Sequence, residues 1–244
     1  MYQFKTALNG PVILRSVESF AQDLVDSPMP STPLEILART QALILYSLIR
    51  LFDGDISARA AAERHFDHLE ASAYALLPHV VFQTDESNSA TAITDESFSL
   101  SSLTDMPTTP DELPLFPLTA TEVFWKNWIL QESMRRTILF SFHLILLYDL
   151  MAQRKNPVRC YKSLACKTWT MSAHLWEAPT SLDFALAWKT KKHFVMESLN
   201  PSLFDEVVRD GRADDVESFG KMFLTTYMGV TQARGWFLSR GGML

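Results

Sequence analysis

A histidine and two acidic residues that could do acid–base chemistry lie close together in the second half of the chain. The sequence His174-Leu175-Trp176-Glu177 places an imidazole and a carboxylate within reach of each other, and Asp183 follows after a turn at Ala178-Pro179. Such a pair beside a pocket can act as general acid and base. The alternative is that His174 is a core histidine with its hydrogen bonds satisfied, and that Glu177 or Asp183 caps a helix. We favour this alternative and expect no catalytic site; an enzyme would use His174, Glu177 and Asp183.

The cysteines and the other closely spaced histidines do not predict a metal site. Cys160 and Cys166 form no C-x-x-C pair, whereas a structural zinc site needs four ligands in two close pairs. The pattern His65-x-x-His68 can chelate a metal, but two histidines on a charged helix face are usually solvated. The chain also contains no Gly-rich phosphate loop, no dinucleotide fingerprint and no G-x-S-x-G motif. We therefore expect neither a metal nor a cofactor.

The composition indicates a packed, mainly helical protein with an acidic balance. Of 244 residues, 47% are apolar and 11% aromatic, which is typical of a globular core, and only 8 are glycine, few for a protein of many hairpins. The formal net charge of −6 argues against a protein that neutralises many phosphates by itself. The 2 cysteines and the lack of a secretory signal pattern indicate a reducing compartment. The apolar run 138–148 is shorter than the roughly 20 residues of a membrane-spanning helix, so it predicts a buried helix.

Helices must position the candidate residues, and the sequence predicts where several of them begin. Thr32-Pro33 starts a helix whose apolar residues continue at helical spacing to Phe52. The turn Asp53-Gly54-Asp55 joins it to a second helix at 57–77, which gives an antiparallel hairpin. The pattern Thr119-Ala120-Thr121-Glu122 predicts a capping box and a helix to about Met151. Further elements are expected within 1–27 (helix), at 168–176 (strand or short helix), at 181–194 and 203–210 (helices), and at 214–237 (helix, broken near Gly229 or Gly235).

Residues 83–118 differ from the rest of the chain. They are rich in Ser, Thr, Asp and Pro and contain no Lys or Arg, a composition that buries too little apolar area to offset its ordering entropy. We therefore expect an all-α fold, a multi-helix array of antiparallel helices with a disordered acidic insertion. Three segments follow: N-terminal helices including the hairpin at 1–82, a flexible acidic linker at 83–118, and the C-terminal helical part of the same domain at 119–244.

Two blocks of sequence resemble a known family. One is Trp125-x-x-Trp128-Ile129-x-x-Glu132-Ser133-x-Arg135-Arg136-Thr137, which continues into the apolar helix 138–151. The other is Leu175-Trp176-Glu177-Ala178-Pro179, followed by Phe184-Ala185-x-Ala187-Trp188. Both resemble the regulatory region of fungal zinc-cluster transcription factors, known as the middle homology region or fungal-specific transcription factor domain. The hairpin at 37–77 is similar to an earlier part of that region.

The resemblance implies an all-α array in which the matched residues are structural. Glu132, Arg135 and Arg136 fall at i, i+3 and i+4 of one helix, where opposite charges can pair. The two arginines would then bind a carboxylate from another helix, because a guanidinium fits a carboxylate with two parallel hydrogen bonds. The resemblance thus implies a structural clasp made by these three residues.

The resemblance also implies a transcription-regulatory protein of the nucleus, or of nucleus and cytoplasm, that controls a secondary-metabolite or catabolic gene cluster. It would act through partners in the transcription machinery, through a zinc-cluster factor, or by sensing a small-molecule effector. The family's DNA-binding module is rich in zinc-ligating cysteines, which this chain lacks, so we expect no direct contact with nucleic acid and none with a membrane. The alternative is a small-molecule binder or biosynthetic isomerase or cyclase, with a pocket lined by Trp169, His174, Trp176 and Trp188.

Overall fold

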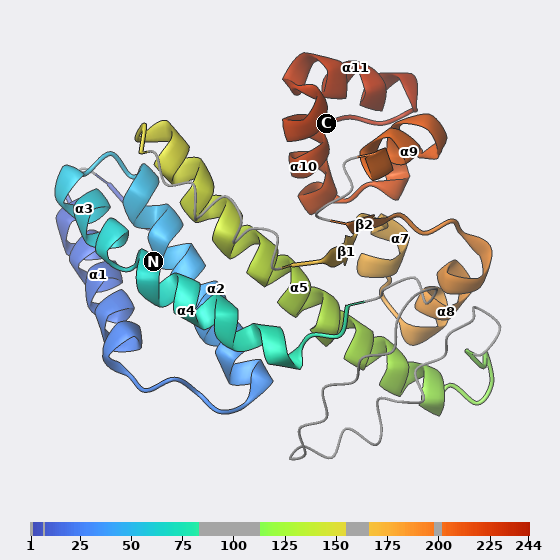
Figure 1. Cartoon of the computed structure of the whole chain (residues 1–244), viewed down its shortest axis with the longest axis horizontal. Helices are drawn as coiled ribbons and strands as arrows, with labels where there is room; N and C mark the ends of the chain where they lie inside the picture. Colours follow the sequence, from blue (N-terminus) through green and yellow to red (C-terminus); the bar gives the residue numbers. More distant parts are fainter. Residues whose placement is uncertain (1, 7, 83–112, 155–165, 198–201) are drawn as a thin grey trace. The chain divides into compact units, whose positions relative to one another are not determined.

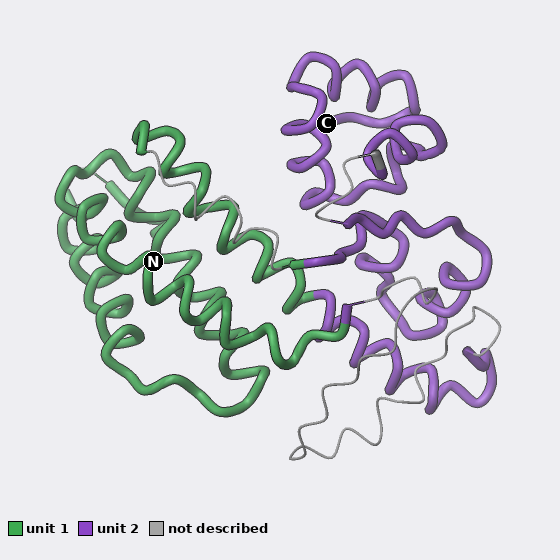
Figure 2. Tube along the Cα trace, viewed as in Figure 1, with its two compact units in different colours: residues 1–81, 133–166 green, residues 82–132, 167–244 purple. Residues whose placement is uncertain are grey.

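The computed structural model describes residues 2–6, 8–82, 113–154, 166–197 and 202–244. The chain divides into two compact units, shown in different colours in Figure 2. Unit 1 comprises Met1–Val81 and Ser133–Cys166, and unit 2 comprises Phe82–Glu132 and Lys167–Leu244. The long helix α5 (Thr119–Met151) contributes its residues up to Glu132 to unit 2 and the rest to unit 1.

Unit 1 is a group of helices in which α2 contacts α1, α3 and α4 (Figure 1). Its elements are η1 (Tyr2–Phe4), α1 (Gly10–Asp26), α2 (Pro33–Phe52), α3 (Ile56–Arg64), α4 (Phe66–Leu76), η2 (Leu77–His79) and the second half of α5. The start of α2 is as predicted. Thr32 has extended backbone angles, its hydroxyl oxygen accepts a hydrogen bond from the Glu35 N–H at 3.4 Å, and Pro33 is the first helical residue.

The hairpin turn is confirmed, but the single helix predicted at 57–77 is wrong. Gly54 has φ +97°, a conformation that favours glycine, and Asp55 caps α3 by accepting a 2.7 Å hydrogen bond from the Ala58 N–H. The expected helix is divided at His65, whose φ of −92° and ψ of 0° separate α3 from α4. The His65 side chain is buried and hydrogen-bonded to side chains of α1 and α2. These distant contacts are not encoded in the local periodicity.

The core of unit 1 forms where α2, α3, α4 and the second half of α5 meet. Phe66 and Leu69 are essentially unexposed, and the Phe66 ring meets that of Tyr148 edge to face at a centroid distance of 5.4 Å. Burial of each such side chain contributes about 1.5–3 kcal/mol. The remaining buried members of this cluster are Leu43, Ile44, Leu51, Ala62, Leu144 and Ile145. The predicted burial of the apolar run 138–148 is thereby confirmed for its inward-facing residues.

Unit 2 combines short helices with a two-stranded antiparallel ribbon. Its elements are the first half of α5, β1 (Thr168–Thr170), α7 (Ala173–Trp176), α8 (Ser181–Thr190), β2 (Val195–Glu197), α9 (Ser202–Asp210), η5 (Ala213–Asp215), α10 (Ser218–Met228) and α11 (Val230–Ser239). The ribbon pairs Trp169 with Met196. The sequence predicted either a strand or a short helix at 168–176. The structure has both, since β1 is followed by α7 within this segment.

An aromatic cluster forms the core of unit 2 between α5, α7 and α8. Phe184 is completely buried, and its ring centroid lies 5.1 Å from that of Trp128 and 5.4 Å from that of Trp188. The other buried members are Leu113, Phe124, Leu175, Ala185 and Ala187. This cluster joins the two blocks of sequence that carry the family resemblance, because Trp128 belongs to the first block and Phe184 to the second.

The last predicted helix is broken at Gly229, one of the two positions that we expected. Gly229 has φ +84° and separates α10 from α11. The helix predicted at 181–194 ends earlier, at Thr190, and the following residues lead into β2. Thr180 caps the start of α8, because its hydroxyl oxygen accepts a hydrogen bond from the Asp183 N–H at 3.1 Å.

The expectation of an all-α fold is confirmed, with a small ribbon added. The acidic stretch 83–118 falls mostly outside the described residues, which resume at Leu113. The division into segments 1–82, 83–118 and 119–244 stays a prediction. Across the described ranges, no helix combines the length and the hydropathy that are needed to cross a membrane.

Candidate functional site

Glu132, the first residue of the expected clasp, lies buried in unit 2. Only 1% of its surface is exposed, and its Oε1 accepts a 2.8 Å hydrogen bond from the backbone N–H of Thr170 in β1. A buried carboxylate that accepts a backbone N–H makes a charge-assisted hydrogen bond. Glu132 thus connects α5 to the ribbon.

Arg135 and Arg136 belong to unit 1 and are 7% and 6% exposed. Arg135 Nη1 donates a 2.8 Å hydrogen bond to the backbone carbonyl of Val81, and the thiol of Cys166 donates to the carbonyl of Arg135 at 3.2 Å. The α5 helix is therefore attached at this point to two segments that are distant in sequence. That the two arginines bind a carboxylate of another helix stays a prediction. The Cys166 thiol is buried, as expected, while Cys160 lies outside the described residues.

Replacing Glu132 with alanine is expected to lower the free energy of unfolding by roughly 2–3 kcal/mol, because the charge-assisted hydrogen bond from the buried Thr170 N–H is lost. Glu132→Gln keeps an acceptor oxygen and should cost less. Urea unfolding measures both changes. The matched control is Glu122→Ala on the same helix, where the side chain is 50% exposed and paired with Lys126; a loss below about 1 kcal/mol is expected there. Equal losses for Glu132→Ala and Glu122→Ala would contradict the structural role.

His174 lies in α7 with its side chain only 4% exposed. Its Nδ1 is 3.8 Å from Oδ1 of Asp215 in η5, beyond hydrogen-bond distance, and neither ring nitrogen has a hydrogen-bond partner among the described residues. Burial, followed by the proximity of His193 and Lys191, lowers the pKa of His174 to about 4. The imidazole is therefore neutral at physiological pH. His174 is buried, as a core histidine would be, but its ring nitrogens lack the hydrogen bonds that we expected of one within the described residues.

His193 lies between His174 and Trp188. Its ring centroid is 5.7 Å from that of His174 and 4.9 Å from that of Trp188, and burial lowers its pKa. His193 Nε2 and Trp188 Nε1 are also buried and have no hydrogen-bond partner within the described ranges. Several polar nitrogens without partners are thus gathered beside the aromatic cluster. Each such group costs about 1–3 kcal/mol when it is left unpaired.

The other candidate residues of unit 2 lie apart from this group. Trp169 contacts the rings of Phe219 and Phe223 at 5.3 and 5.1 Å, and Trp176 packs against the aromatic cluster. Glu177 is exposed at the end of α7. The carboxylate of Asp183 accepts a 2.6 Å hydrogen bond from the Thr180 hydroxyl at the start of α8. The carboxylate that lies near His174 is therefore that of Asp215. Of the four pocket candidates, His174 and Trp188 both lie next to His193.

No group of three or more His, Cys, Asp or Glu side chains suited to a metal ion occurs in the part of the chain that the structure describes. His65, which we expected on a solvated helix face, is only 7% exposed. Its Nδ1 lies 3.2 Å from Arg50 Nη2 and its Nε2 lies 3.2 Å from Gln22 Oε1. Because arginine only donates, Nδ1 accepts and Nε2 carries the proton that is donated to Gln22.

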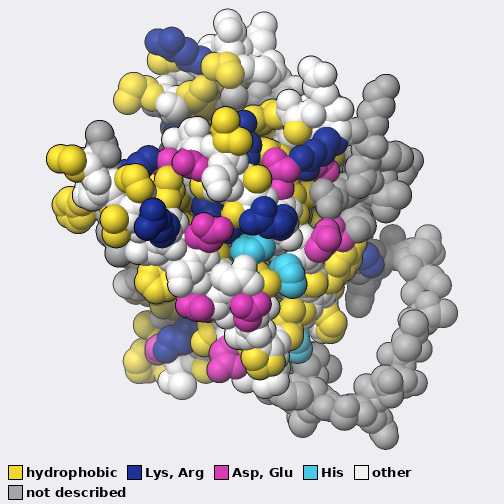
Figure 3. Space-filling model, turned by 90° about the vertical axis from the view of Figure 1, so that its left-hand side faces the viewer, with side chains coloured by type: hydrophobic (Ala, Val, Ile, Leu, Met, Phe, Trp, Pro, Cys, Tyr) yellow, Lys and Arg dark blue, Asp and Glu magenta, His cyan; other side chains and the backbone are white. Residues whose placement is uncertain are grey.

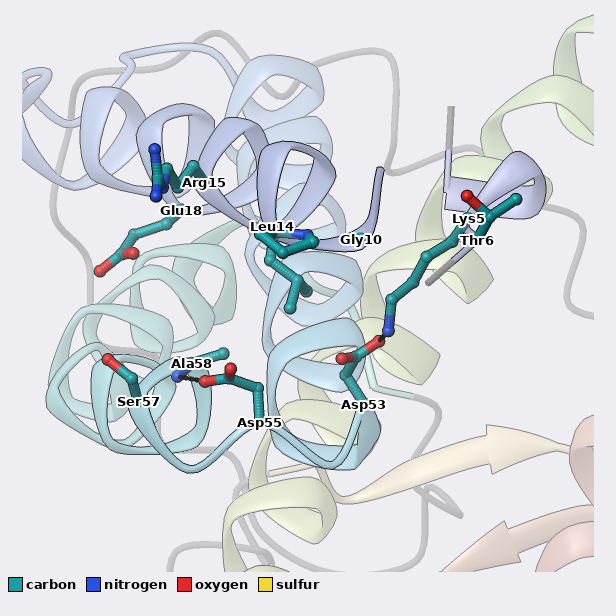
Figure 4. A pocket seen from close by; sticks show the side chains of 11 residues that line it. Lys5, Thr6, Gly10, Leu14, Arg15, Glu18, Asp53, Asp55, Ser57 and Ala58 are labelled. Atoms are coloured by element: carbon teal, nitrogen blue, oxygen red, sulfur yellow. Dashed lines mark hydrogen bonds and ion pairs between the residues drawn. The ribbon is translucent and has the colours of Figure 1, made fainter. Parts of the chain in front are cut away.

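Unit 1 also contains a cavity of about 510 Å³ (Figure 4). Three segments line it: the N-terminal residues before α1, the first half of α1, and the turn from α2 into α3. The residues are Lys5, Thr6, Gly10, Pro11, Leu14, Arg15, Glu18, Asp53, Asp55, Ser57 and Ala58. Gly10 lets the Lys5 side chain pass closely, since a Cβ at that position would lie 3.0 Å from Lys5 Cε.

His193, Asp215 and the cavity have no clear signal in the amino-acid sequence. His193 follows Lys191 and Lys192, and nothing in this local pattern connects it to His174. Asp215 is far from His174 along the chain, and no spacing pattern connects them. The cavity depends on the packing of an N-terminal segment against a turn that is distant in sequence. Only the turn itself, Asp53-Gly54-Asp55, had a recognisable signal.

Comparison with known proteins identifies one informative similarity. Transcription factor gsfR2 of Penicillium aethiopicum is 24% identical to this chain over 238 residues, which cover 97% of this chain and 50% of that protein. The chain thus spans about half the length of this curated relative. No family model matches the chain, and no solved structure matches it. The similarity supports a relationship between this chain and fungal transcription factors.

Proposed function

We propose that this chain is the regulatory part of a fungal transcription regulator and that it acts in the nucleus. The observation that carries the proposal is the similarity to transcription factor gsfR2, which extends over 97% of the chain. The residues of the two resembling blocks support it, because Trp128 and Phe184 pack together in one core and Glu132 connects α5 to the ribbon. The similarity also favours regulation over catalysis.

We further propose that the chain acts through protein partners, among them a zinc-cluster factor, rather than by contacting DNA. The formal net charge of −6 supports this, because a protein that binds phosphates usually presents a basic surface. On the face shown in Figure 3, acidic and basic side chains are interspersed and do not gather into a basic patch. The genes that it controls would form a secondary-metabolite or catabolic cluster.

Deletion of the gene, followed by transcript sequencing, tests this function. We expect the transcripts of a gene cluster to change, and to return to normal on complementation with the wild-type gene. Complementation with Phe184→Ala should fail, because Phe184 is the centre of the aromatic core, whereas Leu182→Ala on the same helix should succeed. Unchanged cluster transcripts in a clean deletion would contradict the proposal.

Tagging the protein in the same strain tests the mode of action. Purification should recover a protein with a zinc cluster, and occupancy of the target promoters by the tagged chain should be lost when that partner is deleted. Promoter occupancy that persists without any partner, together with binding of the purified chain to promoter DNA, would show direct DNA contact and contradict this part of the proposal.

A further inference from the structure

The cavity of unit 1 is open to the surface and has the size of a small-molecule site. Its volume of about 510 Å³ falls within the roughly 300–1,000 Å³ that is usual for ligand pockets. Its walls come from the N-terminal segment, α1 and the α2–α3 turn, all within one compact unit. Leu14 lies among the charged side chains in Figure 4 and offers apolar contact to an aliphatic ligand.

The charges that line the cavity favour a cation. Three carboxylates, of Glu18, Asp53 and Asp55, face two cationic side chains, of Lys5 and Arg15. Asp53 is paired with Lys5. Asp55 uses Oδ1 to cap α3, and Glu18 lies close enough to the buried Arg50 to act on the pKa of that guanidinium. Counted over the lining residues alone, three carboxylates and two cations leave one negative charge in excess.

The side chain of Lys5 shows how the cavity accommodates an alkylammonium group. Its Nζ is bound by the Asp53 carboxylate, whose side chain is only 4% exposed, and it lies 5.9 Å from the centre of the Tyr2 ring. The Tyr2 hydroxyl donates a 2.8 Å hydrogen bond to the same carboxylate. The proximity of Asp53, and to a smaller extent of Asp55, raises the pKa of Lys5. The potential at this point of the cavity is therefore negative.

We propose that this cavity binds a small aliphatic amine that carries more than one ammonium group. One ammonium group pairs with Glu18 and another with Asp55, while the methylene chain contacts Leu14 and Ala58. Lys5 acts as a tethered competitor, because its own ammonium group occupies the third carboxylate, Asp53. A role of this amine as an effector of transcription rests on the proposed function, whereas its binding to the chain does not.

Isothermal titration calorimetry of the purified full chain at low ionic strength tests the proposal, with cadaverine and spermidine as probes and the dianion glutarate as the counter-probe. We expect both amines to bind and glutarate not to bind. Low ionic strength is needed because salt weakens the attraction between the amine and exposed carboxylates; at 0.1 M salt this attraction is screened beyond about 10 Å. No heat of binding with either amine at millimolar concentration, or binding of glutarate as strong as that of cadaverine, would overturn the proposal.

Three substitutions locate the binding. Glu18→Gln and Asp55→Asn should each weaken cadaverine binding about two- to fivefold, and the double variant about tenfold, as expected for partly exposed ion pairs. Asparagine is as good a helix cap as aspartate, so Asp55→Asn should keep α3 and the fold. Asp23→Asn, also on α1 but outside the lining, is the matched control and should leave the affinity unchanged. Equal affinities of the double variant and the Asp23→Asn control would overturn the proposal.

Lys5→Met gives a test of opposite sign. It removes the tethered ammonium group, keeps the length of the side chain and leaves Asp53 available, so we expect tighter binding of both amines. Weaker binding would contradict the assignment of Lys5 as a competitor. Since calorimetry uses no transcriptional readout, failure of amine binding leaves the proposed function intact. Conversely, unchanged transcripts on gene deletion leave the binding result intact.

Discussion

Replacing Phe184 with alanine is expected to lower the free energy of unfolding by about 3–5 kcal/mol. The side chain is completely buried in unit 2, and its ring lies 5.1 Å from Trp128, 5.4 Å from Trp188 and 6.0 Å from Phe124. Alanine removes the whole ring and leaves a cavity among three bulky neighbours that cannot all collapse into it. A loss of this size is a large share of the 5–15 kcal/mol that stabilises a typical domain.

The measurement is urea unfolding followed by tryptophan fluorescence, because two of the neighbouring rings are indoles. Leu182→Ala is the control: Leu182 lies on the same helix but is 39% exposed, so a change below about 1 kcal/mol is expected. Loss of regulation in Phe184→Ala would then follow from loss of folded protein. If Phe184→Ala were no more destabilising than Leu182→Ala, the aromatic cluster would not be the core of unit 2.

Helix starts are the part of the fold that short-range signals predict well. Thr32 with Pro33 marks the start of α2, and α5 begins at Thr119 and ends at Met151, as the pattern indicated. Gly229 marks the break between the last two helices for a local reason, its positive φ. In each case the residues that decide the structure lie within one turn of the position that they determine.

Features that depend on distant residues were not predictable in this way. The helical pattern is divided at His65, whose ring donates a hydrogen bond to Gln22 and accepts one from Arg50. The ribbon needs β1 and β2 to meet across the intervening α7 and α8. Among the site residues, the sequence favoured a buried His174. Asp215 lies near His174 only because η5 packs against α7, and no local pattern predicts that contact. The clasp residues were found because their spacing on one helix is itself a local signal.

Acidification from pH 7 to pH 4 is expected to destabilise the protein by roughly 6 kcal/mol through two buried histidines. His65 and His174 each have a pKa of about 4, lowered mainly by burial from the ordinary 6.5. Each shift corresponds to roughly 3 kcal/mol. Because the unfolded chain takes up a proton near pH 6.5 and the folded chain only near pH 4, this stability is fully present above pH 6.5 and is lost as the pH falls to about 4.

The structural cause at His65 is specific. Its Nδ1 accepts a hydrogen bond from Arg50, a fully buried guanidinium, so protonation of Nδ1 replaces that hydrogen bond by repulsion between two buried cations. After burial, the proximity of Arg50 is the next largest cause of the lowered pKa. Glutamine at this position can still accept from Arg50 and donate to Gln22 but does not titrate.

Unfolding by urea at a series of pH values between 7 and 4 measures this dependence. His65→Gln should remove about half of the loss that His65 and His174 together cause. The part of the window above about pH 5 separates these histidines from the paired carboxylates Asp53 and Glu63. A carboxylate whose pKa is lowered on folding loses its stabilising effect only as the pH falls through the ordinary values of 3.8 and 4.5. A pH dependence of His65→Gln equal to that of the wild type would mean that Arg50 and His65 do not share a buried hydrogen bond, and the division between α3 and α4 would need another cause.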